Sequence, residues 1–115
     1  MKSLESTPLD RREREAIEAA GNLLRMRFPV EKIILFGSKA RGESDEYSDI
    51  DLLVISSGPL HWKEEKAIVE VLFDLGMEYD VLFSPLFASS AEWEEGIFKE
   101  FPIYREILEE GTVIP

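Results

Sequence analysis

The chain contains no cysteine and only one histidine, His61. The absence of cysteine excludes disulfide bonds and thiolate metal sites, and it is compatible with a reducing compartment. No stretch of the sequence approaches the roughly 20 apolar residues of a membrane-spanning helix, and the N-terminal residues hold no apolar signal core. From these absences we expect a cytoplasmic protein that does not contact a membrane.

Basic residues are few compared with acidic ones, since 13 lysines and arginines stand against 24 aspartates and glutamates, which gives a net charge of −11. This excess opposes docking on nucleic acid, because neutralising the phosphates requires lysine and arginine. We therefore expect no direct contact with nucleic acid. A nucleotide bound through a divalent cation, or a basic protein partner, remains compatible with the charge, and solubility alone would also explain it.

The length of 115 residues and the apolar fraction of 44% suit one domain with a real core. Such a chain is too short for a catalytic domain plus a large substrate-binding domain. We therefore treat residues 1–115 as a single domain. A large substrate would have to be held partly by another molecule.

Hydrophobic periodicity predicts alternating helices and strands. In chain order they are helix 8–28, strand 32–36, strand 49–55, helix 62–75, strand 79–83, a helix after Ser89 that Pro102 kinks or splits, and a short strand at 112–114. The order α-β-β-α-β-α indicates an α/β fold with helices packed on a small mixed sheet. The first two strands are too close in sequence for a helical crossover, so we expect them to pair directly and antiparallel.

Asp49 and Asp51 stand at the start of the second predicted strand. Residues two apart on a strand project from the same face, so the two carboxylates lie side by side while Ile50 points into the core. Unpaired like charges at this distance destabilise each other and raise one pKa. A Mg²⁺ ion would resolve the conflict and keep open positions for water and phosphate.

Asp80 repeats this pattern near the start of the strand expected at 79–83. If that strand neighbours the second one, Asp80 joins Asp49 and Asp51 in one cluster. Three carboxylates suit a two-metal site for in-line displacement at phosphorus. Asp80 would then hold the metal that activates the incoming hydroxyl.

Gly37 and Ser38 directly follow the strand expected at 32–36. A glycine there, leading into a short helical turn, exposes backbone N–H groups that can cradle a phosphate, and Ser38 adds a hydroxyl donor. Either Lys39 or Arg41 could neutralise phosphate oxygens, and we favour Arg41 because arginine suits bidentate contact. The polar segment from residue 43 to residue 48 is expected to be a loop.

Each of these features is weak alone, but Gly-Ser, ten residues and then Asp-x-Asp should arise by chance in only about one chain in a thousand. The sequence GSKARGE from Gly37 to Glu43, followed by SDIDLLV from Ser48 to Val54, resembles the signature of the DNA polymerase β-type nucleotidyltransferase superfamily. It is most similar to the minimal nucleotidyltransferases (the MNT family) of prokaryotes. The resemblance is highly specific for the family and its reaction type, but it says little about the substrate.

The resemblance implies transfer of a nucleoside monophosphate, AMP from ATP in our interpretation, with Mg²⁺ and release of pyrophosphate. Two metal ions would take part during catalysis. The positions matched are Gly37 and Ser38 for the nucleotide phosphates, Arg41 for the basic residue of the loop, and Asp49, Asp51 and Asp80 for the catalytic, metal-binding carboxylates.

Many minimal members of the family are encoded beside a HEPN-domain RNase toxin and serve as its antitoxin, some by transferring AMP onto a tyrosine of the toxin. The resemblance therefore implies a hetero-oligomer of this chain with a HEPN partner that provides the accepting hydroxyl. Two alternatives stay open. The chain could neutralise the partner by occlusion without catalysis, or it could modify a small molecule such as an aminoglycoside.

The remaining conspicuous side chains predict less. His61 precedes a helix and lies far in sequence from the carboxylates, so a catalytic role is not favoured. Trp62 and Trp93 each begin an apolar helical stripe, which favours packing in the core or at an interface over stacking on a base.

Overall fold

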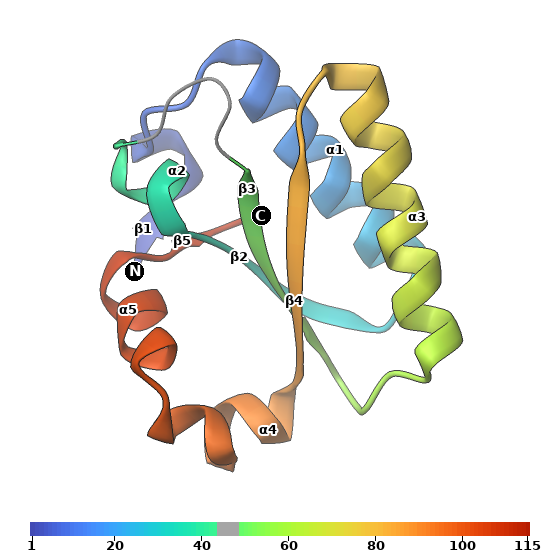
Figure 1. Cartoon of the computed structure of the whole chain (residues 1–115), viewed down its shortest axis with the longest axis vertical. Coiled ribbons are helices and arrows are strands. Elements are labelled where there is room, and N and C mark those ends of the chain that lie inside the picture. The colour runs from blue at the N-terminus through green and yellow to red at the C-terminus, as the bar shows by residue number, and fades with distance from the viewer. Residues whose placement is uncertain (44–48) are drawn as a thin grey trace.

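The computed structural model describes residues 1–43 and 49–115, so the loop expected up to residue 48 lies almost wholly outside the described residues. The elements (Figure 1) are β1 (Lys2–Ser3), η1 (Leu4–Ser6), α1 (Arg11–Arg27), β2 (Val30–Phe36), α2 (Gly37–Arg41), β3 (Ile50–Ser56), α3 (Trp62–Tyr79), β4 (Phe83–Ser89), α4 (Ser90–Glu95), η2 (Ile97–Glu100), α5 (Pro102–Glu110) and β5 (Thr112–Val113). None of the helices in these ranges combines the length and the apolarity that crossing a membrane requires.

The strands form one mixed sheet in the order β1-β5-β2-β3-β4. The pair β2 and β3 is antiparallel, as expected from the short connection, whereas β3 and β4 are parallel. β3 therefore lies inside the sheet, and from Leu52 to Ser56 it is buried throughout. β4 lies at an edge of the described sheet. The predicted α/β fold with a small mixed sheet is confirmed.

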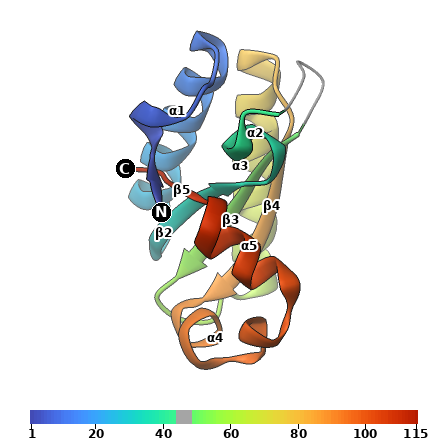
Figure 2. The same cartoon turned by 90° about the vertical axis from the view of Figure 1, so that its left-hand side faces the viewer.

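Side chains of the strands alternate between two cores, one on each face of the sheet. Figures 1 and 2 show α1 and α3 packed together and set apart from α4 and α5. The core beneath α1 and α3 includes Ile17, Leu24, Leu35, Leu52 and Leu72. The core beneath α4 and α5 includes Ile34, Leu53, Ile55, Trp93 and Ile107. The period of two places Asp51 on the same sheet face as Leu53, the face that α5 covers.

The ends of most predicted elements agree with the structure. The first helix ends at Arg27, before Pro29. The Ser89 side chain caps α4 by accepting a hydrogen bond from the Glu92 amide at 3.2 Å, as its spacing predicted. Pro102 stands in the first turn of α5 and so splits the final helical segment, because proline needs no amide partner at a helix start.

The strand expected at 79–83 is wrong. α3 continues to Tyr79, and the strand β4 begins only at Phe83. The helix expected to end at residue 75 continues past Gly76, where a Cβ would lie 2.6 Å from the Val81 carbonyl oxygen. The helix ends instead at Asp80, which adopts the left-handed conformation with φ 56°.

An ion pair between two buried side chains joins α1 to α2. Lys39 on α2 contacts the carboxylate of Glu13 on α1, and the two side chains are only 3% and 8% exposed. Glu13 also belongs to the capping box of α1, in which its carboxylate accepts from the Asp10 amide at 3.1 Å. One glutamate therefore fixes the start of α1 and its contact with α2.

Replacing Lys39 with methionine should destabilise the fold by about 3 kcal/mol or more, because it leaves the Glu13 carboxylate buried without its cation. Urea unfolding followed by circular dichroism measures this loss. The double variant Glu13→Gln/Lys39→Met should lose less than the sum of the two single variants. Additive losses would show that the two side chains do not stabilise each other.

Candidate functional site

Asp49 and Asp51 lie at the beginning of β3, where the chain enters the sheet. Asp49 immediately precedes the strand and is exposed, whereas Asp51 is its second residue and is half-buried. Burial raises the pKa of Asp51, the negative charge of Asp49 raises it further, and Arg41 opposes these effects. The structure therefore brings the two predicted carboxylates close enough to repel each other.

Gly37 lies against the Asp51 carboxylate at the junction of β2 and α2. Its φ of +75° falls in the left-handed region, which strains residues with a side chain. A Cβ at this position would also collide with a carboxylate oxygen of Asp51. Only glycine satisfies both conditions, so this residue allows the backbone of the turn to approach the carboxylate.

The two cations of α2 have different surroundings. Lys39 forms a buried ion pair with Glu13, so its ammonium group is not available to a substrate. The Arg41 side chain is 30% exposed and contacts Glu43 at 3.1 Å. Of these two cations, Arg41 is the one whose side chain reaches the surface. Ser38, half-buried, precedes both in the first turn of α2.

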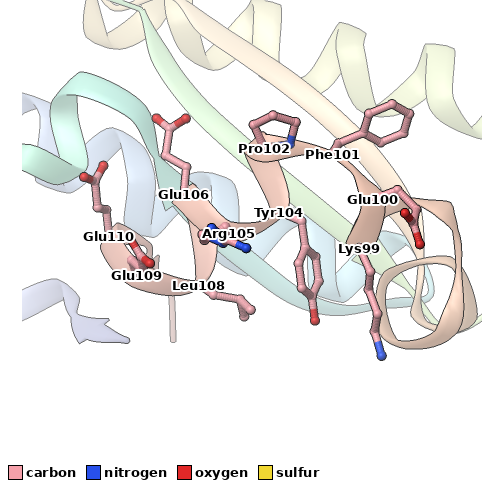
Figure 3. A pocket seen from close by; sticks show the side chains of 10 residues that line it. All are labelled: Lys99, Glu100, Phe101, Pro102, Tyr104, Arg105, Glu106, Leu108, Glu109 and Glu110. Carbon is pink, nitrogen blue, oxygen red and sulfur yellow. The ribbon is translucent and has the colours of Figure 1, made fainter.

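Two glutamates of α5 complete the surroundings of Arg41, and no local sequence pattern indicates them. The guanidinium Nη1 of Arg41 lies 2.9 Å from Glu106 and 3.3 Å from Glu110. Figure 3 shows these two carboxylates on the side of α5 opposite to Tyr104 and Leu108. Hydrogen bonds from Arg41 to Glu43 and Glu110 raise the pKa of its guanidinium above the ordinary value. Glu106 also raises the pKa of Asp51, so α5 contributes to the electrostatics of the carboxylate pair.

Asp80 does not join this cluster, which corrects the expectation of a third carboxylate. It ends α3 outside the strand, its side chain is 96% exposed, and it pairs at 3.4 Å with Arg12 of α1. That helix covers the face of the sheet opposite to Asp51. The residue that lies beside Asp51 in the β3–β4 register is Ser84.

The carboxylates that the structure brings together fit one bound cation better than two. Within residues 1–43 and 49–115, no group of three or more histidine, aspartate or glutamate side chains is placed to hold a metal ion. Mg²⁺ is commonly bound through one or two carboxylates together with substrate phosphates and water. Asp49 and Asp51 suit that kind of site, whereas the expected two-metal site that includes Asp80 is not formed.

A cavity of about 580 Å³ opens on α5 next to these residues (Figure 3), and its lining includes Tyr104, Arg105, Glu106 and Glu110. Most of its charged side chains are carboxylates, which would repel a triphosphate. His61 lies elsewhere: its imidazole caps α3 by accepting from the Lys63 amide at 3.1 Å, which accounts for this histidine without catalysis.

Comparison with known proteins agrees with this geometry. A family model described as "Nucleotidyltransferase domain" matches residues 17–114. The "Putative protein adenylyltransferase MJ0604" of Methanocaldococcus jannaschii is 32% identical over 104 residues, which cover 89% of this chain and 97% of the relative. The "Putative protein adenylyltransferase MJ0141" of the same organism is 39% identical over 57 residues, and this match spans 50% of the chain and 58% of that relative.

Solved structures share the fold. A structure described as "Structure of putative minimal nucleotidyltransferase" is 26% identical, with a TM-score of 0.62 and coverage of 98% of this chain and 95% of the other. A chain of a "toxin-antitoxin with AMP-PNP" is 21% identical, with a TM-score of 0.56 and coverage of 84% and 70%, which is a likeness of fold alone. The extent of the family match and the near full-length relative decide the assignment: this chain is a nucleotidyltransferase and belongs to the minimal members of the nucleotidyltransferase domain family.

Proposed function

We propose that this chain transfers AMP from ATP to a hydroxyl group of a partner protein, and that it is the antitoxin of a HEPN RNase toxin. Both M. jannaschii relatives are named as protein adenylyltransferases, and a toxin-antitoxin structure shares the fold. The net charge of −11 suits a basic nuclease as partner. The observation that carries the proposal is the close approach of the Gly37 backbone to the Asp51 carboxylate.

This approach would bring a phosphate bound at the turn and a cation bound at the carboxylates next to each other. Asp49 and Asp51 would hold Mg²⁺, which when bound withdraws charge from the phosphate oxygens. Ser38 would donate its hydroxyl to a phosphate oxygen. Arg41 would neutralise part of the triphosphate charge, since its guanidinium remains partly exposed.

The reaction forms a bond between the acceptor oxygen and the α-phosphorus of ATP and breaks the bond from that phosphorus to the bridging oxygen of the β-phosphate. Pyrophosphate leaves, and the hydroxyl proton passes to solvent or to a carboxylate of the site. The naming of both M. jannaschii relatives as protein adenylyltransferases favours a protein acceptor over an aminoglycoside-like molecule.

The direct test is to incubate the chain with Mg²⁺, labelled ATP and the protein encoded by the neighbouring gene. We expect the neighbour to gain the mass of AMP, and the Asp49→Ala/Asp51→Ala variant to lose this activity by a factor of about 1,000 or more. Intact-protein mass spectrometry measures the transfer. A neighbour that is never modified, yet is still neutralised by the double variant, would instead establish a non-catalytic binding module.

Asp51 also predicts how stability depends on pH. Its raised pKa means that the folded chain holds this proton more tightly than the unfolded chain, so the charged carboxylate costs stability at neutral pH. Asp51→Asn should therefore raise the melting temperature by a few degrees at pH 7 without divalent cations. The gain should shrink as pH falls through the raised pKa and vanish below the ordinary value of 3.8.

Melting curves with and without Mg²⁺ extend this measurement. Mg²⁺ should stabilise the wild-type chain but not Asp51→Asn, because the variant has lost an anionic ligand. Asp74→Asn, an exposed aspartate on α3, is the matched control and should respond like the wild type. Equal stabilisation of all three proteins by Mg²⁺ would contradict the assignment of the metal ligands.

Gly37→Ala tests the observation that carries the proposal. The positive φ should cost about 1–2 kcal/mol of stability, and the new Cβ should displace Asp51, which reduces transfer by about 100-fold. Gly58→Ala is the control, because a Cβ there meets nothing within 4 Å. Urea unfolding and the transfer assay measure the two effects, and a fully active Gly37→Ala variant would disprove the role of this contact.

A further inference from the structure

The outer face of α3 carries an apolar stripe that nothing in the described structure covers. Val69, Phe73 and Met77 recur at helical spacing and are 45%, 63% and 71% exposed. Leu82, in the connection to β4, extends this surface and is 59% exposed. Single exposed apolar residues are ordinary, but four large ones gathered around one groove indicate a binding surface. We call these four residues the apolar stripe.

The stripe borders a groove of about 280 Å³ between α3 and the start of β4. Leu72 and Gly76 line the groove on the helix, while Phe83 and Pro85 line it on the strand. The surface therefore has a hollow and a raised apolar border, the shape that accepts the apolar side chains of a helix.

One side of the stripe is bordered by an acidic row formed by Glu70, Asp74 and Glu78. These residues recur every four positions, so they lie in line along the exposed side of α3. None of them has an ion-pair partner among the described residues. From residue 67 to residue 91 the sequence has four acidic residues and no lysine or arginine, and only the fourth, Asp80, meets a cation, Arg12.

We propose that the apolar stripe and the acidic row form the docking site for a basic amphipathic helix of a partner protein. The partner's apolar side chains would enter the groove, and lysines or arginines flanking them would face Glu70, Asp74 and Glu78. This docking site rests on the proposed function, because it takes the partner to be a protein.

Other occupants fit the surface less well. A second copy of the chain would place two acidic rows opposite each other in a symmetric dimer, with −11 charge on each copy. An added β-strand would have to pair with the β4 edge, where Pro85 has no amide hydrogen to donate. An anionic membrane surface would be repelled by the acidic row.

The test uses two synthetic helical peptides that have the same leucine stripe, flanked by lysines in one and by glutamates in the other. Fluorescence anisotropy measures their binding to the full chain without nucleotide or Mg²⁺. The lysine peptide should bind at least about tenfold more tightly than the glutamate peptide. Phe73→Ser and Met77→Ser should each weaken its binding by about tenfold or more.

Two further variants make the test specific. Leu108→Ser removes an exposed apolar side chain on α5 and should leave binding unchanged. The triple variant Glu70→Lys/Asp74→Lys/Glu78→Lys alters only exposed positions, and it should reverse the preference toward the glutamate peptide. Equal binding of both peptides, no binding of the lysine peptide, or loss of binding in Leu108→Ser but not in Phe73→Ser would overturn the proposal.

Sedimentation of the chain alone examines the second-copy alternative. A dimer that Phe73→Ser dissociates would show that the occupant is another copy of the chain. The Asp49→Ala/Asp51→Ala variant should bind the lysine peptide like the wild type, because the apolar stripe does not depend on the carboxylates. Failure of nucleotide transfer is thereby distinguished from failure of docking.

Discussion

The close approach of the Gly37 backbone to the Asp51 carboxylate is the constraint on which the rest of the site depends. It requires a residue without a Cβ and with a positive φ directly after β2. It also requires the antiparallel register that sets Phe36 opposite Asp51. The sheet pairing and the turn therefore fix together how the Gly37 backbone lies relative to the Asp51 carboxylate. This register brings the polar turn after β2 next to the acidic start of β3, so that the two form a single site.

Arg41 of α2 opposes the effect of the negative charge gathered at Asp51, and this short helix is held from both faces of the sheet. Lys39 is committed to Glu13 and ties α2 to α1 on one face of the sheet. Arg41 contacts Glu106 and ties the same short helix to α5 on the other face. α2 is thus held from both layers, which positions Ser38 and Gly37. A five-residue helix could not hold its place by its own hydrogen bonds.

The sequence predicts what depends on local pattern and misses what depends on distant contacts. Periodicity and capping chemistry place most helices and strands, and the Gly-Ser and Asp-x-Asp pair places the centre of the site. The position of Asp80 is predicted wrongly because the valine, leucine and phenylalanine after it favour a strand, whereas α3 continues to Tyr79 and ends at Asp80 in the left-handed conformation. Glu106 was missed because its partner Arg41 is 65 residues away in the chain, and no local pattern records such a pairing.

The start of β4 connects the carboxylate site with the groove beside α3. Ser84 lies beside Asp51 in the parallel register, while its neighbours Phe83 and Pro85 line the groove beside α3. Successive side chains of a strand project from opposite faces of the sheet, so a helix seated in the groove would lie on the face opposite to Asp51. A residue that follows such a helix could then reach the site around the end of β4. In the proposed function, the partner would present its hydroxyl group to the nucleotide by this route, while the apolar stripe holds the partner in place.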